Sequence, residues 1–198
     1  SGAGLPNFMN IPGENYNGIM SSNEYLTRVN LMGASKPEHD TPVFFGKNVA
    51  VIGGGNTAMD SVRTAKRLGA ERAMIIYRRS FNEMPARKEE IRHAQEEGIE
   101  FLNLHAPVAY FADETGHVKQ IKLQKMELSE PDESGRRKPV PVKGSEFLLD
   151  ADLVIVSVGV SPNPLVPQSM PDLNISKWGT IMVNQDVMES NIRGLFAG

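Results

Sequence analysis

The sequence contains no cysteine. Disulfide bonds, a thiol nucleophile and an iron–sulfur cluster held by this chain are therefore excluded, because each needs cysteine sulfur. The four histidines lie more than ten residues apart and match no zinc-ligand spacing, so we expect no metal site. Any redox chemistry would need a bound organic cofactor.

The sequence also lacks an excess of one charge and a long apolar run. The formal net charge is −3 and the basic residues are scattered, so the electrostatic pattern of a nucleic-acid-binding protein is missing. No apolar run approaches the roughly 20 residues that cross a bilayer. The start, Ser1 to Pro6, lacks the layout of a signal peptide. We therefore expect a cytoplasmic protein without nucleic-acid or membrane partners.

The remaining composition is that of a globular protein. Of the 198 residues, 40% are hydrophobic, which is enough to form a core, and 23% are charged, as is usual for a globular protein. The strand-like Asn48–Ile52, the helix-like Thr57–Leu68 and the strand-like Ala73–Tyr77 follow one another as a crossover unit requires. A second helix is expected to begin at Met84-Pro85-Ala86, with Pro85 in its first turn.

From Val108 onward the pattern changes to strands joined by turn residues, with a charged loop at Ser129–Lys138 and a short strand at Thr180–Val183. The run Leu153–Gly159 is typical of another buried parallel strand. We therefore predict an α/β fold: a Rossmann-like, doubly wound sheet with an antiparallel β flap.

A G-x-G-x-x-A pattern lies between the first strand and the first helix of the crossover unit. Its residues are Gly53, Gly54, Gly55, Asn56, Thr57 and Ala58. The first glycine permits a tight turn, the third lets backbone approach a pyrophosphate, and Ala58 permits close packing of helix on strand. The free N–H groups of the helix start then face the diphosphate. A purely structural turn, or another nucleotide-like ligand such as S-adenosylmethionine, is the alternative.

The end of the second strand predicts which dinucleotide is preferred. An Asp or Glu there would hold the ribose hydroxyl of NAD, but this sequence has Arg78 and Arg79. Guanidinium groups bind a 2′-phosphate through charge-assisted hydrogen bonds, so NADP(H) is the expected ligand. The alternative is a pair of solvated arginines.

Groups for acid–base catalysis are not evident. Asp60 and Arg63 are spaced for a local ion pair on the first helix, and Glu89 and Glu90 suit a solvated helix start. No Ser–His–Asp or Cys–His pairing can be proposed, so we name no catalytic residue.

Several segments, in order along the chain, resemble the small (β) subunit of NADPH-dependent glutamate synthase. The large subunit of an NADH-dependent ferredoxin:NADP oxidoreductase is similar too. The segments are Ile11–Glu14, Val51–Asp60, Tyr77–Arg79 with Met84–Arg87, Glu130–Arg137, and Val158-Gly159 with Pro162-Asn163.

The resemblance implies a flavoprotein in which an NADP domain is inserted into an FAD domain. Electrons would pass from NADPH to FAD and on to iron–sulfur clusters in the parent protein or a partner. It also implies that Gly53 and Gly55–Ala58 hold the diphosphate, that Arg78 and Arg79 hold the 2′-phosphate, and that Gly159 lies near the nicotinamide. The partner would be a large subunit of the glutamate synthase type or a ferredoxin-linked subunit.

By the same resemblance, the segments Ser1–Ala3 and Thr180–Gly198 are similar to crossings into the FAD domain. We expect a connector at residues 1–20, the NADP-binding domain at 21–160 and a return segment at 161–198. A second glycine fingerprint is missing from the sequence, so we expect a fragment of the parent oxidoreductase that is inactive alone. A non-catalytic module that senses NADP(H), and a transferase on a Rossmann core, are the competing functions.

The isolated chain should bind NADP(H) and retain little or no FAD. This can be checked from the visible absorption of the purified protein. A stoichiometric flavin spectrum would contradict the expectation.

Overall fold

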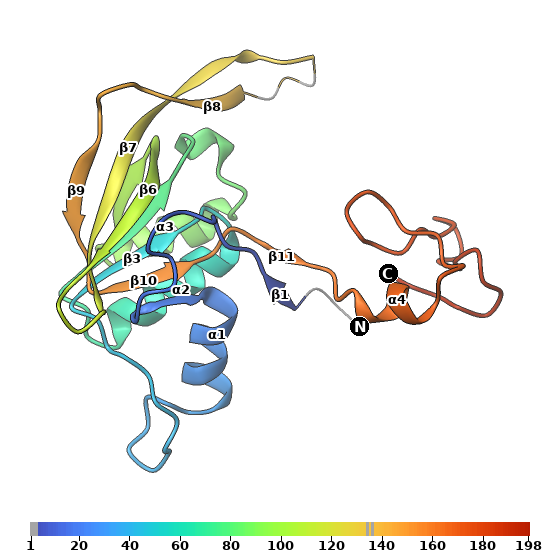
Figure 1. Cartoon of the computed structure of the whole chain (residues 1–198), viewed down its shortest axis with the longest axis horizontal. Coiled ribbons are helices and arrows are strands. Elements are labelled where there is room, and N and C mark those ends of the chain that lie inside the picture. The colour runs from blue at the N-terminus through green and yellow to red at the C-terminus, as the bar shows by residue number, and fades with distance from the viewer. Residues whose placement is uncertain (1–3, 134, 136) are drawn as a thin grey trace. The chain divides into compact units, whose positions relative to one another are not determined.

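The computed structural model describes residues 4–133, 135 and 137–198. Ser1–Ala3, Ser134 and Arg136, which belong to the resembling segments above, lie outside the described residues. The chain forms two compact units, which are described separately below. The first consists of Phe8–Val158, and the second of residues 4–7 together with Gly159–Gly198 (Figure 1).

The larger unit is built around a five-stranded parallel sheet with the strand order β2-β10-β3-β4-β5. The strands are β2 (Ile19–Ser21), β3 (Asn48–Ile52), β4 (Arg72–Tyr77), β5 (Glu100–Asn103) and β10 (Leu153–Val156). All four residues of β10 and the last four of β3 are buried. These continuous apolar runs form strands because both faces of the sheet are covered.

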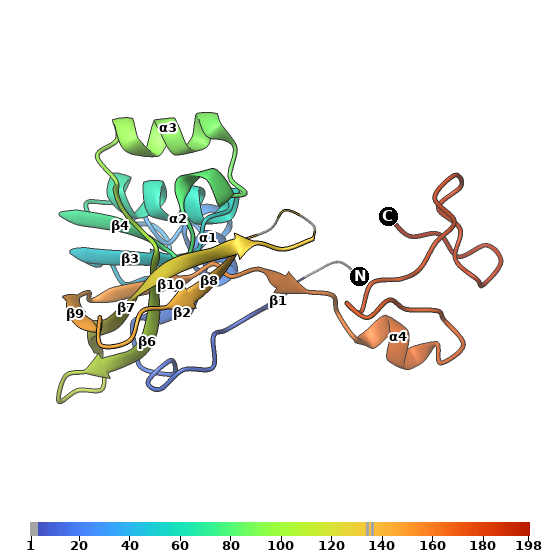
Figure 2. The ribbon, with the colours of Figure 1, turned by 90° about the horizontal axis from the view of Figure 1, so that it is seen from above.

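Helices cover one face of this sheet, as Figure 2 shows. They are α1 (Ser22–Leu26), which continues as a π-helix (Thr27–Leu31), α2 (Asn56–Arg67), a 3₁₀ turn η2 (Phe81–Glu83) and α3 (Lys88–Glu96). Met59 and Val62 on α2 pack with Val51 and Ile75 from the sheet in one hydrophobic core. The helical segment that begins at Ser22 has π geometry in its second half.

Antiparallel strands cover the opposite face. They are β6 (His105–Ala112), β7 (Val118–Pro131), β8 (Arg137–Pro141) and β9 (Phe147–Asp150), with β7 pairing with each of the other three. Tyr110 and Ile121 from this flap form a second core with Ile76 and Val154 of the parallel sheet. The predicted α/β fold with an antiparallel flap is confirmed. The charged loop is shorter than expected, because Pro131 already pairs with Arg137.

The smaller unit contains little regular structure. β1 (Leu5–Pro6) pairs antiparallel with β11 (Val160–Ser161), and α4 spans Leu165–Ser169. The strand expected at Thr180–Val183 is reduced to isolated bridges, from Ile181 to Ile175 and from Val183 to Ser190. Its large apolar side chains include three that are more than 60% exposed: Leu165, Trp178 and Phe196.

Ion pairs connect α2 with α3 and with Glu97, the residue that follows α3. Arg63 contacts Glu90 at 2.6 Å and Glu97 at 2.9 Å, and Arg67 contacts Glu97 at 2.6 Å. The hydrogen bonds from Arg67 and Arg63 lower the pKa of Glu97. The expected local pair of Arg63 with Asp60 is therefore wrong, and Glu90 is an ion-pair partner rather than a solvated helix start. The carboxylates that Arg63 contacts are about thirty residues away in the sequence, so the spacing of residues along α2 could not predict them.

If the flap belongs to the same cooperative core as the parallel sheet, truncating a flap residue should destabilise the whole unit. Ile121→Ala removes a fully buried side chain and should lower the free energy of unfolding by about 2–5 kcal/mol. Leu148→Ala on the neighbouring strand is the matched control, because Leu148 is 54% exposed, and its effect should stay within about 0.5 kcal/mol.

Denaturant unfolding followed by circular dichroism measures both changes. Equal stabilities of the two variants would contradict the packing described above.

Candidate dinucleotide site

The glycine turn begins where three parallel strands meet. Gly53 follows β3 with a φ of +148°, and a Cβ built there would lie 2.3 Å from the carbonyl oxygen of Ser157. The Gly53 N–H donates to Ile76 O at 3.0 Å, and the Ser157 N–H donates to Ile52 O at 2.8 Å. Glycine is needed at this position because the backbones of neighbouring strands approach too closely for any side chain.

Gly54 is fixed by contact with an aromatic ring. A Cβ at Gly54 would lie 2.7 Å from ring carbons of Tyr77, the last residue of β4. The Gly54 carbonyl accepts a hydrogen bond from Ala86 N at 3.0 Å. The Tyr77 hydroxyl in turn donates to Glu83 O at 2.8 Å. The turn, the end of β4 and the segment after it therefore form one connected structure.

Gly55 differs from the other two glycines. A Cβ at this position would meet no heavy atom within 4 Å, and its φ of −91° is accessible to any residue. The Gly55 carbonyl accepts from Ala58 N and Met59 N, which starts α2. The N–H groups of Asn56 and Thr57, the first two helical residues, have no acceptor within the helix. Open space beside free N–H groups is what an anion at a helix start requires.

Asn56 and Thr57 are exposed, whereas Ala58 is fully buried against the sheet. The Asn56 side-chain oxygen accepts a hydrogen bond from Arg87 N at 2.9 Å. The N–H of Ala86 donates to Gly54 O, and that of Arg87 donates to the Asn56 side chain, so residues 84–87 are not helical and α3 begins only at Lys88. The predicted helix start at Met84 is therefore wrong. These residues border the turn, and no local sequence pattern indicated this.

The two arginines after β4 are available to a ligand. Five arginines of the larger unit pair with glutamates: Arg28, Arg63, Arg67, Arg72 and Arg92. Among the described residues, Arg78 and Arg79 have no such carboxylate partner. Arg78 is exposed, while Arg79 is partly buried and its Nε has no hydrogen-bond partner there. Neither guanidinium charge is neutralised by a carboxylate of the described residues, so both could bind an anionic group.

A capping box orders the chain directly after these arginines. The backbone N–H and the hydroxyl of Ser80 both donate to the Glu83 carboxylate, at 3.1 and 2.5 Å. The hydroxyl also accepts from Asn82 N. These bonds, the Ser80 hydroxyl above all, lower the pKa of Glu83, and the charge of Arg137 adds to the effect. The Glu83 carboxylate is thus bound to Ser80 instead of to the preceding arginines.

The residue predicted to lie near the nicotinamide belongs to the smaller unit. Gly159 has a φ of +101°, and its carbonyl accepts from Asn7 N at 3.0 Å. The Asn7 side chain accepts a hydrogen bond from the Ser161 hydroxyl. Gly159 is therefore part of the β1–β11 connection, and its role toward a nicotinamide stays a prediction.

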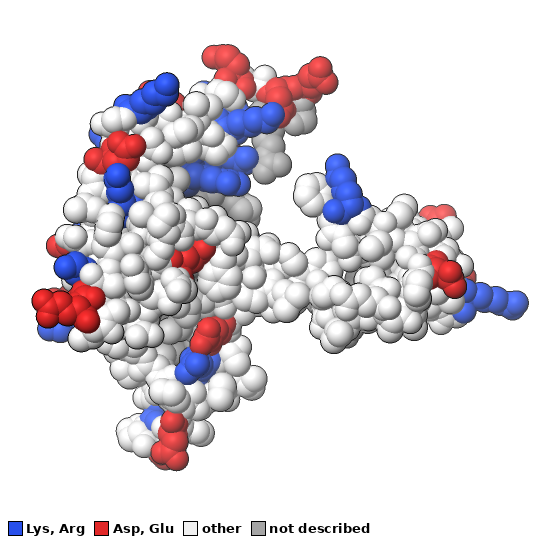
Figure 3. Space-filling view, viewed as in Figure 1, with Lys and Arg blue, Asp and Glu red and all other residues white. Residues whose placement is uncertain are grey.

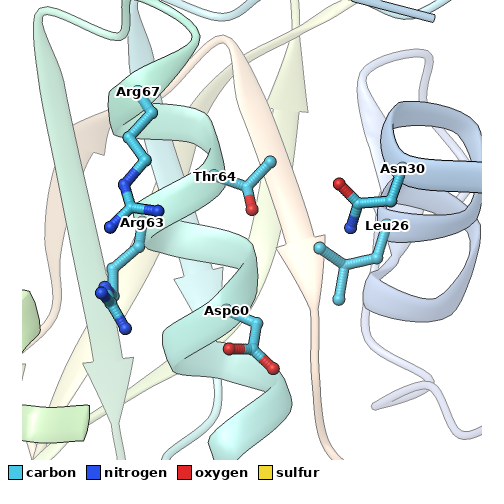
Figure 4. Close-up of a pocket in the computed structure, with 6 residues that line it drawn as sticks. All are labelled: Leu26, Asn30, Asp60, Arg63, Thr64 and Arg67. Carbon is cyan, nitrogen blue, oxygen red and sulfur yellow. The ribbon is translucent and has the colours of Figure 1, made fainter. Parts of the chain in front are cut away.

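Away from the glycine turn and the two arginines, the described residues form a further pocket. In Figure 4 Asp60 and Thr64 of α2 face Leu26 and Asn30 across this pocket, which Arg63 and Arg67 also line. On the face seen in Figure 3, charges of both signs are interspersed with broad uncharged areas. Within the described part of the chain, no His, Asp and Glu side chains group to hold a metal ion. No helix there is long and apolar enough to span a membrane.

Comparison with known proteins places this geometry in a family. The family model for pyridine nucleotide-disulphide oxidoreductases matches residues 1–198. The chain belongs to this family. An NADP(+)-dependent formate dehydrogenase subunit beta of Moorella thermoacetica is 40% identical over 185 residues, which cover 93% of this chain and 25% of that protein. A putative glutamate synthase [NADPH] small chain of Cereibacter sphaeroides is 38% identical, covering 94% of this chain and 45% of the relative.

The predicted resemblance to glutamate synthase small subunits is thus confirmed. The chain spans less than half the length of these relatives. Among solved structures, FprA of Mycobacterium tuberculosis in complex with NADPH superposes with a TM-score of 0.73 at 21% identity, over 96% of this chain and 54% of FprA. This likeness confirms the oxidoreductase fold.

The glycine geometry predicts different consequences at adjacent positions. Gly53→Ala should destabilise the fold by more than about 2 kcal/mol, because its Cβ would meet Ser157 O in a conformation that alanine avoids. Gly55→Ala should stay within about 1 kcal/mol of the unaltered protein, because its φ is ordinary and the space is open.

Thermal unfolding of the two variants side by side measures the difference. A Gly55→Ala variant as unstable as Gly53→Ala would show that Gly55 too is required by internal packing.

Proposed function

We propose that this chain is the NADP(H)-binding domain of an oxidoreductase. The observation that carries the proposal is the contrast among the glycines. Gly53 and Gly54 are required by the packing of the protein itself, whereas Gly55 borders only open space at the start of α2. A glycine without a structural reason, next to free helix N–H groups, supports a site where backbone approaches a diphosphate.

The 2′-phosphate is assigned to the arginines after β4. Arg78 and Arg79 lack carboxylate partners among the described residues, so a phosphate would not have to displace one. Tyr77 contacts Gly54 of the diphosphate turn and directly precedes the two arginines in the chain. The proposed sites for the diphosphate and for the 2′-phosphate are therefore connected through Tyr77. A dianionic phosphate binds guanidinium groups through charge-assisted hydrogen bonds. NADP(H) is therefore favoured over NAD(H).

In the whole protein, we place this domain at the point where electrons enter. Bound NADPH supplies a hydride, and FAD held by the remainder of the protein is its acceptor. The chain's own residues bind and orient the dinucleotide, since positioning is the protein's contribution to such a transfer. Under this proposal residues 1–20 and 161–198 connect to the FAD domain, and Gly159 lies near the nicotinamide.

Subsequent electron transfer lies outside this chain. With no cysteine in the sequence, iron–sulfur clusters would be held elsewhere in the protein or in a partner. The names of the relatives support a larger partner, since one is a subunit beta and another a small chain. A cytoplasmic assembly with such a subunit is part of the proposal. Membership of an oxidoreductase family favours this function over the transferase alternative.

Removing the arginines should alter the preference between the two dinucleotides. Arg78→Ala and Arg79→Ala should each weaken NADPH binding about 10- to 100-fold, as the loss of a charge-assisted hydrogen bond does, and leave NADH binding unchanged. Arg72→Ala is the matched control, because Arg72 begins the same strand and pairs with Glu100. It should alter neither affinity.

Isothermal titration with NADPH and NADH measures these constants. S-adenosylmethionine is titrated alongside as the competing ligand. An unchanged ratio of NADPH to NADH affinity in both arginine variants would contradict the assignment.

A further inference from the structure

Of the four buried side-chain polar atoms of the described residues that have no hydrogen-bond partner, three lie at or just after the ends of β4 and β5, and the fourth is the Tyr110 hydroxyl of β6. Among the described residues, the amide oxygen and nitrogen of Asn103 and the Nε of Arg79 are shielded from solvent and have no partner. Buried polar groups are nearly always hydrogen-bonded, so each exception needs an explanation. Here an acceptor and a donor are both unpaired in the part of the molecule that would hold the 2′-phosphate.

The sheet places these residues together. Asn103 is the last residue of β5 and lies directly opposite Tyr77 in the parallel ladder between β4 and β5. Residues in register have side chains on the same face of a sheet. Asn103 therefore shares a face with the ring that supports Gly54. The next residue, Leu104, donates its N–H to Arg79 O at 3.0 Å.

The backbone around Asn103 is held in an uncommon conformation. Leu104 has a φ of +57°, which a branched side chain rarely adopts. On the same turn, the Asn103 carbonyl lies 2.8 Å from Nδ1 of His105. The Leu104 carbonyl accepts from Met126 N at 2.7 Å, which connects the turn to β7. Such conformations persist only where surrounding contacts fix them, so the position of Asn103 is well defined.

The chemistry of the two side chains is complementary. An asparagine oxygen can accept a hydrogen bond from the Arg79 Nε–H, which would leave the two terminal nitrogens free for a phosphate. A carboxylate in this place would compete with the phosphate for the guanidinium charge, whereas a neutral amide orients the group and leaves its charge available.

We propose that Asn103 is a positioning residue for Arg79 and thereby a determinant of the preference for a 2′-phosphorylated dinucleotide. When NADP(H) is bound, the Asn103 oxygen accepts from Arg79 Nε and directs the guanidinium plane toward the phosphate. This inference rests on the proposed function. It adds a residue from β5 to a phosphate site otherwise formed by the turn after β3, the start of α2 and the segment after β4.

A double-mutant cycle tests this role. Asn103→Ala should weaken NADPH binding about tenfold, the factor expected for one hydrogen bond, and leave NADH binding unchanged. In the Arg79→Ala background, Asn103→Ala should have no further effect, because the group that it orients is gone. Asn103→Asp should weaken NADPH binding more than Asn103→Ala does, since its charge would face the phosphate.

Asn82→Ala is the matched control, because Asn82 is an exposed asparagine near the same arginines, and it should change neither affinity. Titrations with NADPH and NADH are combined with thermal unfolding of every variant. Equal weakening of both ligands by Asn103→Ala would indicate a merely structural role and overturn the inference.

Two further outcomes separate this inference from the proposed function. If Arg79→Ala alters the NADPH preference but Asn103→Ala does not, the inference fails and the proposed function stands. If the unaltered chain binds no NADPH, both fail.

Discussion

The close approach of the Gly53 backbone to the Ser157 carbonyl is the constraint on which the site depends. A Cβ at Gly53 would lie only 2.3 Å from that oxygen, so the ends of β3 and β10 can come together only around glycine. From this point the chain turns into α2, and the helix start is exposed beyond the carboxyl end of β3, the central strand of the sheet. Gly54 then rests on Tyr77, whose hydroxyl binds the segment before α3. Packing inside the protein thus shapes the turn, and leaves Gly55 open on the side where a ligand would approach.

Local patterns predicted the crossover unit well. β3, α2 and β4 appear close to their expected bounds, because each has the apolar periodicity of its element and glycine marks the turn. The pattern Met84-Pro85-Ala86 predicts a helix start that the structure does not have. Its hydrogen bonds run to Gly54 and Asn56, about thirty residues earlier, and no local pattern encodes such a contact. Local spacing also predicts the wrong partner for Arg63, since the carboxylates that it contacts belong to α3 and its C-terminal cap. Asn103 had no motif at all, and only its unpaired, buried amide in the folded chain draws attention to it.

The two units differ in how much regular secondary structure and buried core they contain. The larger one has a parallel sheet with a hydrophobic core on each face, one beneath helices and one beneath the antiparallel flap. The smaller one has short pairings and exposes Trp178 and Phe196. The chain spans less than half of the relatives described above, and our proposal assigns the smaller unit to an FAD domain completed by the remainder of the protein. Binding of the dinucleotide would then be a property of the larger unit, and hydride transfer a property of the whole.

The central claim is that a dinucleotide diphosphate lies at the start of α2 with its 2′-phosphate at the arginines after β4. An NMR titration of isotope-labelled protein tests this residue by residue. NADP⁺ should shift the backbone amides of Gly55, Asn56 and Thr57 together with the Nε–H signal of Arg79. NAD⁺ at equal occupancy should shift the three amides and leave Arg79 Nε–H in place. Shifts confined to other surfaces, or the same Arg79 response to both dinucleotides, would contradict the account.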